Sequence, residues 1–297
     1  MASISLKAHA KINLTLNITG RRQNGYHLMD SLVVFADLAD QITITTNNAD
    51  QLNITGQQAD ALKNIDAANN ILVTALNAYR NHTGWDQKFY LTLEKNIPVA
   101  AGIGGGSSDA AAVLTAANRL NPSPCSAADL AEIGLGIGAD LPVCLKQYLS
   151  QTQSSAQSPQ WRMQGIGEDL TALSIESLRN AGLLLVNPMV GVSTRDVFKQ
   201  LRQSTFNKNN SLKQDADLAT WLACGNDLTT PAMALEPKIE RQIDHLSSLI
   251  NHAGYLHHGM SGSGATCYTL FDHPDAAKSA LEKIAPLMAW SWAGKLI

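Results

Sequence analysis

The sequence has no long apolar run and no excess of positive charge. No stretch approaches the roughly 20 apolar residues that span a bilayer, so we expect no membrane partner. Lysine and arginine number 22 against 25 aspartates and glutamates, which gives a net charge of −3. Proteins that bind nucleic acid usually carry a basic surface. This balance therefore disfavours a nucleic-acid partner, but it allows a local positive site for a small charged molecule.

Cysteine is scarce, with four residues in a chain of 297. Their spacing matches no zinc or redox motif, and we interpret them as four separate buried thiols, typical of a reducing compartment. They are Cys125, Cys144, Cys224 and Cys267. The N-terminal segment MASISLKAHAKINL lacks the apolar core of a signal peptide. These features predict a cytoplasmic protein and leave its oligomeric state open.

The hydrophobic periodicity predicts a fold of the α+β class. Alternating or continuously apolar segments indicate strands, and apolar residues three and four apart indicate helices. The expected strands are 4–18, 31–36, 41–46, 88–94, 183–187 and the end of 260–271. The expected helices are 69–80, an alanine-rich segment after residue 106, one that begins within 129–134, 193–203, 236–253 and 274–288. Strands and helices do not alternate regularly, so we expect helices laid against largely antiparallel sheets.

A chain of 297 residues is long for one domain and suits two lobes. The segment 147–160 is rich in glutamine and serine and can bury little, so we expect an exposed loop or linker there. The predicted domains are residues 1–158 and 159–297. The last strand could return to the first lobe.

The strongest local signal is a glycine-rich segment, PVAAGIGGGSSDAA, at residues 98–111. Its glycines allow positive φ and leave the backbone uncovered, so successive N–H groups can converge on an anion. We expect Ser107 or Ser108 to cap the helix that follows, whose N-terminus adds partial positive charge. The segment therefore predicts a site for a di- or triphosphate. The alternative is a flexible turn that only caps a helix.

Two common phosphate-binding motifs do not fit this segment. A Walker A loop needs a lysine directly before serine or threonine, and the dinucleotide fingerprint needs a third glycine where Ser107 stands. The segment instead resembles the phosphate loop of the GHMP kinases, the superfamily of galactose, homoserine, mevalonate and phosphomevalonate kinases. Their pattern is P-x-x-x-G-L-G/A-G-G-S-S-D/N-A-A. Ile103 stands here for the usual leucine.

Other motifs resemble one branch of this superfamily. They are AKINL, GYH, GADLPV, NPMVGVSTRDVF, GNDL and MSGSGAT, spread over nearly the whole chain. That branch phosphorylates the 2-hydroxyl of 4-diphosphocytidyl-2-C-methyl-D-erythritol in the non-mevalonate route to isoprenoid precursors. The resemblance implies the two-lobed GHMP fold with a cleft between the lobes. It also implies ATP with Mg²⁺ over the glycine loop, and a small cytidine-diphosphate substrate across the cleft.

The resemblance further implies a catalytic pair, Lys11 and Asp140. Asp140 would accept the proton of the substrate hydroxyl, while Lys11 would keep Asp140 ionised and stabilise charge on the attacking oxygen. Without the resemblance, Lys11 would be interpreted as a solvated lysine on a strand. Asp140 would then be a turn aspartate or a helix cap.

The ligand-binding residues that the resemblance implies form two sets. The nucleotide set is Pro98, Val99, Ala100, Ala101, Gly102, Ile103, Gly104, Gly105, Gly106, Ser107, Ser108 and Asn70. The substrate set is Asn13, Tyr26, His27, Thr194, Phe198, Gly262, Ser263 and Gly264. Asn13 would orient the reacting centre, Tyr26 would stack on cytosine and His27 would hydrogen-bond the ring edge. The three residues 262–264 would close over the transferring phosphate.

The region after LPVCL departs from the family pattern. The family continues briefly through a strand pair to G-x-G-E, whereas here the glutamine- and serine-rich segment precedes residues 165–168 (GIGE), like an insertion of roughly ten residues. We therefore assign no functional residue between Lys146 and Arg162. The metal ligands are unassigned too: Ser108 is a candidate, and the ion could contact mostly phosphate and water. We interpret the neighbouring His257 and His258 as a loop pair.

Three alternatives remain open at this stage. The glycine loop alone fits a homoserine or mevalonate type of GHMP kinase, although AKINL followed by GYH disfavours both. A regulator on the same fold could bind a ligand without catalysis, but the presence of Lys11 and Asp140 argues against it. A protein that binds no nucleotide would leave the glycine loop without a role.

Overall fold

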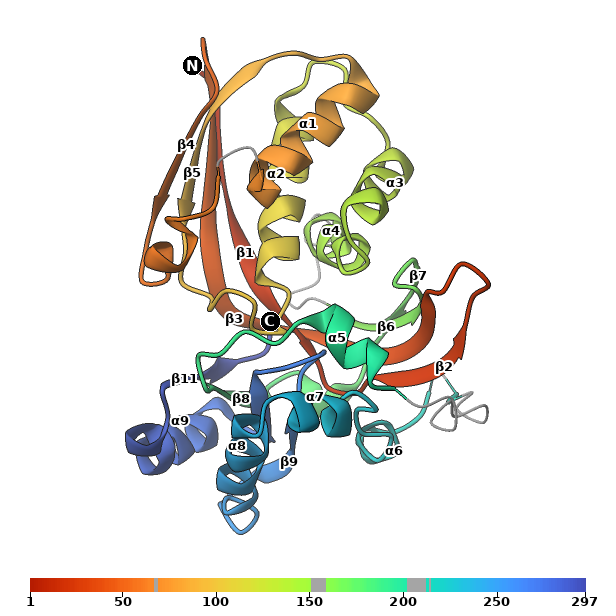
Figure 1. Ribbon diagram of the computed structural model, residues 1–297, viewed down its shortest axis with the longest axis vertical. Coiled ribbons are helices and arrows are strands. Elements are labelled where there is room, and N and C mark those ends of the chain that lie inside the picture. The colour runs from red at the N-terminus through yellow and green to blue at the C-terminus, as the bar shows by residue number, and fades with distance from the viewer. Residues whose placement is uncertain (67–68, 151–158, 202–211, 214) are drawn as a thin grey trace. The chain divides into compact units, whose positions relative to one another are not determined.

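The computed structural model describes residues 1–66, 69–150, 159–201, 212–213 and 215–297 (Figure 1). The chain forms two compact units whose segments alternate along the sequence. The first unit comprises Met1–Ala10, Leu38–Val99 and Gly104–Ala156. The second comprises Lys11–Asp37, Ala100–Ile103 and Gln157–Ile297. The two consecutive lobes expected from the sequence stay a prediction. In the structure, residues 11–37 and 100–103 group with the later half of the chain.

In the part of the first unit that the structure describes, strands combine with four helices. Its strands are the beginning of β1 (Ser3–Asn13), the end of β3 (His27–Asn47), β4 (Gln51–Thr55) and β5 (Lys88–Glu94). Its helices are α1 (Ile71–Thr83), α2 (Gly105–Leu120), α3 (Ala127–Ile137) and α4 (Leu141–Ser150), with a 3₁₀ turn η1 (Ala59–Leu62). β5 pairs antiparallel with β3 and parallel with β4. Figure 1 shows the helices on one side of these strands.

Alternation and small side chains explain the packing of the first unit. Ile42 and Ile44 of β3 pair with Leu93 and Leu91 of β5, and all four side chains are buried on the same face. In α2 every residue from 108 to 117 is buried, and five of these ten are alanine. Alanine lets helix backbones approach closely, so α2 packs between α1 and α4. The glycine loop therefore leads into a helix with a long buried segment.

The second unit contains an antiparallel sheet in the order β11-β8-β10-β9. Its strands are β8 (Gly182–Asn187), β9 (Tyr255–Met260), β10 (Cys267–Phe271) and β11 (Trp290–Lys295). A second group of paired strands contains β2 (Asn17–Arg21), the beginning of β3, β6 (Gln160–Gly165) and β7 (Asp169–Leu173). The helices are α5 (Thr194–Lys199), α6 (Leu218–Leu222), α7 (Thr229–Leu235), α8 (Lys238–Ser247) and α9 (Pro274–Ile284), with 3₁₀ turns η3 (Glu176–Leu178) and η5 (Ala285–Leu287).

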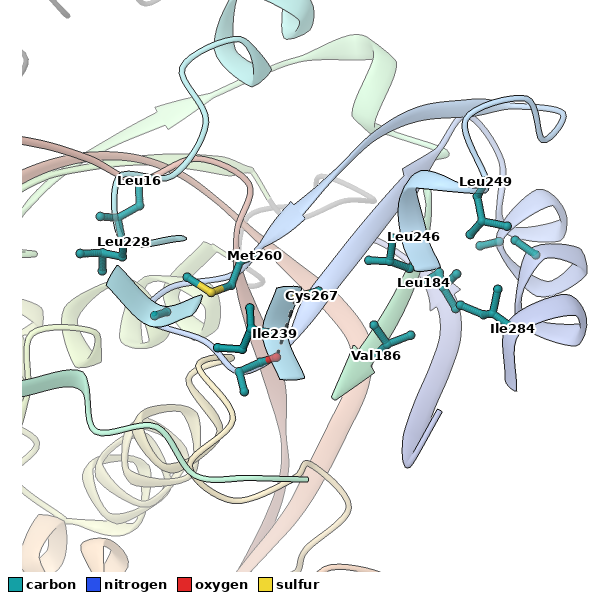
Figure 2. Close-up of a cluster of buried hydrophobic side chains, with 14 of the residues drawn as sticks. Leu16, Leu184, Val186, Leu228, Ile239, Leu246, Leu249, Met260, Cys267 and Ile284 are labelled. Atoms are coloured by element: carbon teal, nitrogen blue, oxygen red, sulfur yellow. Dashed lines mark hydrogen bonds between the residues drawn. The ribbon is translucent and has the colours of Figure 1, made fainter. Parts of the chain in front are cut away.

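The core of the second unit lies between this sheet and the helices α8 and α9. Leu184 and Val186 of β8 belong to one buried cluster with Ile239 of α8 and Ile284 of α9 (Figure 2). Cys267 of β10 lies in the same cluster, where burial raises the pKa of its thiol to about 12. This cysteine therefore acts as a small apolar side chain. The cluster extends to the loop between β9 and β10, because Met260 and Ala265 also belong to it.

A buried ion pair joins β3 to β6 in the second unit. Arg162 forms a bidentate pair with Asp30, and its guanidinium lies 5.4 Å from the ring centre of Trp221 in α6. It also donates to the carbonyl of Leu212 at 2.7 Å. Planar guanidinium groups suit such combined pairing and stacking. One arginine therefore fastens α6 and the segment before it to the strand that starts just after Tyr26.

The predicted α+β class is confirmed, and the pairing is largely antiparallel as expected. The strand 88–94 is confirmed with the predicted bounds. The single strand expected over 4–18 is wrong, because the chain changes partners at Leu16, which bridges to Asn226 and leaves β1 and β2 separate. The strands expected at 31–36 and 41–46 are parts of the one long strand β3.

The helices differ from the expectation mainly at their ends. The helix expected over 274–288 ends at Ile284, since Pro286 cannot continue it. The helices expected over 193–203 and 236–253 are shorter, Thr194–Lys199 and Lys238–Ser247, and residues 202–203 lie outside the described residues. The exposed loop expected over 147–160 is wrong at its beginning, where α4 runs to Ser150 with Gln147 buried. Residues 151–158 lie outside the described ranges.

Two further observations concern expectations from composition. The four cysteines, all of them among the described residues, form no disulfide, but only Cys144 and Cys267 are buried, whereas Cys125 and Cys224 are half-buried. The expectation of four buried thiols is therefore wrong for two of them. In the part of the chain that the structure describes, no helix has the length and apolarity needed to cross a membrane.

Candidate active site

The centre of the glycine loop is held by three backbone contacts within the second unit. The carbonyl of Ile103 accepts a hydrogen bond from Lys11 N at 3.0 Å, and the carbonyl of Ala101 accepts one from Thr266 N at 3.1 Å. The hydroxyl of Ser261 donates to the carbonyl of Gly102 at 3.1 Å. The loop is thus tied to β1 on one side and to the loop 261–266 on the other.

These two glycine loops touch through their backbones. Gly102 has a φ of +75°, and a Cβ built on it would lie 2.4 Å from the carbonyl oxygen of Gly264. A Cβ on Gly262 would lie 2.8 Å from the carbonyl oxygen of Gly102. Only glycine fits such a backbone approach. Gly102 and Gly262 therefore have a packing reason in addition to any contact with phosphate.

Asparagine side chains shape the second of these loops. Asn226 donates to the carbonyls of Met260 and Gly262 at 2.8 and 2.9 Å. Asn187 donates to the hydroxyl of Thr266 at 2.8 Å. The loop also closes on itself through Gly264 N and the carbonyl of residue 261. Side chains from two other segments therefore help to fix this loop.

Lys11 and Asn13 lie side by side at the end of β1, as their spacing predicts. Both are buried, with exposures of 2% and 0%, and the ammonium of Lys11 donates to Oδ1 of Asn13 at 2.7 Å. Asn13 donates in turn to the Ser31 hydroxyl at 2.7 Å, and its backbone N–H donates to Ser261 Oγ at 3.0 Å. Since Ser261 also holds Gly102, one network links the buried lysine to both glycine loops.

The residues expected around cytosine also belong to the second unit. The rings of His27 and Phe198 stack with centres 5.0 Å apart, and the hydroxyls of Thr194 and Ser263 are 2.8 Å apart. Tyr26 is 60% exposed, so its ring face is available to a ligand. Burial, and then the charge of Arg21, lower the pKa of His27. His27 is therefore neutral at pH 7 and offers one donor and one acceptor.

The helix after the glycine loop begins earlier than its serines suggest. α2 starts at Gly105 with Gly104 as its N-cap, in a left-handed conformation with φ of +64°. Ser107 and Ser108 are the third and fourth helical residues, so the prediction that one of them caps the helix is wrong. The first backbone N–H groups of the helix come from Gly105 and Gly106. Such N–H groups have no partner within the helix, which is why helix N-termini favour anions.

Ser108 is a poor candidate for a metal ligand. Its side chain is buried, and its hydroxyl donates to the carbonyl of His9 at 2.7 Å. Among the described residues, no group of three or more histidine, cysteine, aspartate or glutamate side chains could hold a metal ion. The protein groups that the structure describes therefore do not fit a dedicated Mg²⁺ site.

Asp140 and Asn70 both lie at helix ends in the first unit. Asp140 is half-buried in the turn between α3 and α4, and its carbonyl accepts a bond from Cys144 N at 3.3 Å. Asn70 caps α1 through its Oδ1, which accepts from Leu72 N at 3.0 Å. Lys11 and Asp140 belong to different units. Their convergence at one phosphoryl group stays a prediction, as does the contact of Asn70 with the nucleotide base.

A buried ionic cluster flanks the glycine loop in the first unit. The ammonium of Lys95 lies 2.5 Å from Asp40 Oδ2 and 2.7 Å from Asp109 Oδ2, and the three side chains are at most 4% exposed. Burial raises the pKa of Asp109 to about 7, although Lys95 opposes the shift. The nearby carboxylates raise the pKa of Lys95 against the opposing effect of burial. Lys95 therefore stays charged while Asp109 can take up a proton.

This cluster makes stability depend on pH. A carboxyl group whose pKa is higher in the folded chain than in the unfolded chain binds its proton more tightly when folded. The free energy of unfolding of the wild type, relative to Asp109→Asn, is thus expected to fall as pH rises from about 4 to about 7, by at most about 1.4 kcal/mol per pH unit. Thermal unfolding of both proteins at several pH values measures the difference. Parallel curves, or a difference of the opposite sign, would contradict the shift.

The comparisons with known proteins agree with these features. Residues 70–147 match the family description "GHMP kinases N terminal domain", and residues 205–287 match "GHMP kinases C terminal". A curated protein of Granulibacter bethesdensis is 41% identical over 97% of this chain and 93% of its own length. One of Cereibacter sphaeroides is 45% identical over 93% and 92%. Both are named 4-diphosphocytidyl-2-C-methyl-D-erythritol kinase.

The chain belongs to the GHMP kinase family. It is an ATP-dependent kinase of small molecules. A crystal structure of 4-(cytidine 5'-diphospho)-2C-methyl-D-erythritol kinase matches with a TM-score of 0.77 and 28% identity, over 99% of both chains. A homoserine kinase from Cytophaga hutchinsonii matches with a TM-score of 0.64 and 17% identity, over 100% of this chain and 95% of its own. The second likeness shows the shared fold alone.

Some residues of this GHMP kinase that shape the site have no strong sequence signal. Asn226 lies in GNDL, a motif that supports the family resemblance without indicating which backbone groups the side chain holds. Ser261 and Thr266 flank the second glycine loop and could have been suspected from that position alone. Lys95 precedes the glycine loop by three residues, but its partners Asp40 and Asp109 are 55 and 14 residues away in the chain. That separation hides the cluster from inspection of the sequence.

Proposed function

We propose that this GHMP kinase transfers the terminal phosphoryl group of ATP to the 2-hydroxyl of 4-diphosphocytidyl-2-C-methyl-D-erythritol. The observation that carries the proposal is the 41–45% identity, over more than nine tenths of the chain, to relatives that bear the name of this activity. Likeness of fold would not decide the acceptor, because homoserine and mevalonate kinases share the fold.

The geometry of the second unit supports a cytidine-bearing acceptor. Every residue that the resemblance assigns to the substrate belongs to this unit. The stacked pair His27 and Phe198 offers a neutral imidazole beside an aromatic face, and the exposed ring of Tyr26 offers a second face. A neutral imidazole can donate to and accept from the edge of a pyrimidine, and aromatic faces stack on any base. Thr194 connects this region to Ser263 in the second glycine loop.

The chemical step needs alignment and management of charge more than covalent help from the protein. The hydroxyl oxygen of the acceptor bonds to the γ-phosphorus, the bond from that phosphorus to the bridging oxygen breaks, and ADP leaves. We assign the hydroxyl proton to the carboxylate of Asp140. We assign to Lys11 the stabilisation of negative charge on the reacting oxygens, with Asn13 fixing the position of its ammonium through the 2.7 Å hydrogen bond.

We assign the polyphosphate of ATP to the glycine loop and the N-terminus of α2. Backbone amides and a helix N-terminus favour negative charge without a lysine of the Walker type. The contacts of Ala101, Gly102 and Ile103 keep the loop in one conformation before ATP arrives. Preorganised donors of this kind lose little entropy when the phosphate binds. Magnesium is expected to accompany the nucleotide and would neutralise part of its charge.

A comparison of acceptors tests this function. ADP release from ATP should be measured with the diphosphocytidyl substrate, with homoserine and with mevalonate. Because a site built to hydrogen-bond one ligand strongly rejects those that lack the bonding groups, kcat/KM for the diphosphocytidyl substrate should exceed the others by about 10³-fold or more. If homoserine or mevalonate were turned over equally fast or faster, that compound would be the acceptor instead. ATP that fails to raise the melting temperature would argue against nucleotide binding altogether.

A further inference from the structure

We propose that Lys95 is a positioning residue for phosphoryl transfer, which holds the two ends of the glycine loop through Asp40 and Asp109. The inference rests on the proposed role of this loop as the ATP phosphate site. It concerns three side chains that the resemblance assigns neither to the nucleotide nor to the substrate.

Asp40 fixes the segment that enters the loop. Its Oδ1 accepts hydrogen bonds from the backbone N–H groups of Asn96 and Ile97 at 2.5 and 2.8 Å, immediately before Pro98. Its Oδ2 pairs with the Lys95 ammonium at 2.5 Å. One carboxylate therefore binds the backbone of two successive residues and the side chain of the residue before them. These contacts fix the backbone conformation between the end of β5 and the glycine loop.

Asp109 fixes the segment that leaves the loop. It is the fifth residue of α2, and its Oδ2 pairs with the same ammonium at 2.7 Å. The lysine also lies directly against the first residue of the helix, because a Cβ on Gly105 would be 3.2 Å from its Nζ and 3.0 Å from the side chain of Ile97. The first turn of α2 thus packs against Lys95 and Ile97, and these contacts fix the direction of its backbone N–H groups.

Burial makes this arrangement rigid. Lys95 and its two partners have side-chain exposures of 4%, 0% and 2%. Removal of one partner from a buried ionic network leaves an uncompensated charge, so the network resists rearrangement. Phosphoryl transfer is sensitive to small displacements of the groups that hold the phosphate. A shift of the loop ends would therefore change ATP binding in particular, whereas a purely structural cluster would change only stability.

The test compares two substitutions at Asp109. Asp109→Ala removes the bond between Lys95 and α2, and we expect the KM for ATP to rise about 10-fold while the KM for the diphosphocytidyl substrate changes less than about 2-fold. Asp109→Asn keeps an oxygen that can accept from Lys95, so its KM for ATP should stay within about 3-fold of the wild type. Activities are normalised to the folded fraction measured by circular dichroism.

A matched control separates positioning from general stability. Asp50 lies in the same unit, and its carboxylate accepts two bonds from Arg80 and one from the Phe89 N–H. Asp50→Ala should lower the thermal midpoint without a change in the KM for ATP. The proposal is overturned if Asp109→Ala leaves the KM for ATP unchanged, or if Asp50→Ala raises it equally. Absence of ATP binding by the wild type would instead contradict the proposed function of the loop.

Lys95→Arg provides a second variant if Asp109→Ala does not fold. It keeps the positive charge, but its larger head group must press on Gly105 and Ile97. The same selective rise in the KM for ATP is expected. An unchanged KM for ATP in Lys95→Arg would show that ATP binding does not depend on how Lys95 holds the ends of the loop, and would refute the inference.

Discussion

Asp140→Asn is expected to lower kcat by about 10²–10⁴-fold, the usual contribution of a general base. Asparagine has nearly the same shape as aspartate but cannot accept the proton of the acceptor hydroxyl. The polyphosphate is assigned to the glycine loop, so the affinity for ATP should change little. Steady-state kinetics with the diphosphocytidyl substrate, together with titration of ATP by calorimetry, measure the two effects separately. Lys11→Ala should also lose turnover while it still binds nucleotide.

A second aspartate provides the control for this substitution. Asp86 is exposed in the segment before β5, and Asp86→Asn should leave both kcat and ATP affinity unchanged. Turnover by Asp140→Asn at the wild-type rate would remove Asp140 from the mechanism. If Lys11→Ala also kept wild-type turnover, the assignment of the catalytic pair would be wrong, and the proton acceptor would have to be sought elsewhere.

Gly102→Ala is expected to lower the free energy of unfolding by about 2–5 kcal/mol, the sum of left-handed strain and overpacking. The added methyl would lie 2.4 Å from the carbonyl oxygen of Gly264, and it would take a φ of +75° that side chains rarely adopt. Because the obstructing atoms are backbone, no rotamer change can relieve the contact. The two glycine loops must separate. Activity at a temperature where the variant is folded should therefore fall together with the affinity for ATP.

Gly225 provides the matched control for Gly102. It lies in the same unit with a φ of +63°, and nothing lies within 4 Å of a Cβ built on it. Gly225→Ala should therefore show only the strain of the left-handed conformation, about 1–2 kcal/mol. Thermal unfolding of both variants separates strain from steric conflict. Equal effects in the two would mean that the loops do not need their close approach.

Local signals account for the parts that the sequence predicts well. The strand 88–94 alternates strictly, and the glycine-rich segment is followed by a run of alanines, so both features can be recognised within a few residues. The position of Lys11 and Asn13 on the same side of a strand follows from their spacing of two. The family resemblance adds residues such as Phe198, whose ring the structure stacks on His27.

The parts that sequence reasoning missed depend on contacts between distant segments. The break between β1 and β2 arises because Leu16 pairs with Asn226, more than 200 residues later. Serine is a common helix N-cap, but Gly104 occupies the N-cap position of α2. The hydroxyl of Ser108 instead donates a hydrogen bond to the carbonyl of His9. Similarly, nothing near Lys95 in the chain indicates that its ammonium would be buried between two carboxylates.

The alternation of the two units along the chain has a consequence for synthesis on the ribosome. All residues of the first unit have been made by position 156, whereas residues 11–37 must wait for partners as late as Leu296. The donors of the second unit that hold the glycine loop include Ser261 and Thr266, which are translated more than 150 residues after it. Contacts of such long range form late and slowly. A nascent chain therefore cannot hold the glycine loop in its final shape until Ser261 and Thr266 have been synthesised.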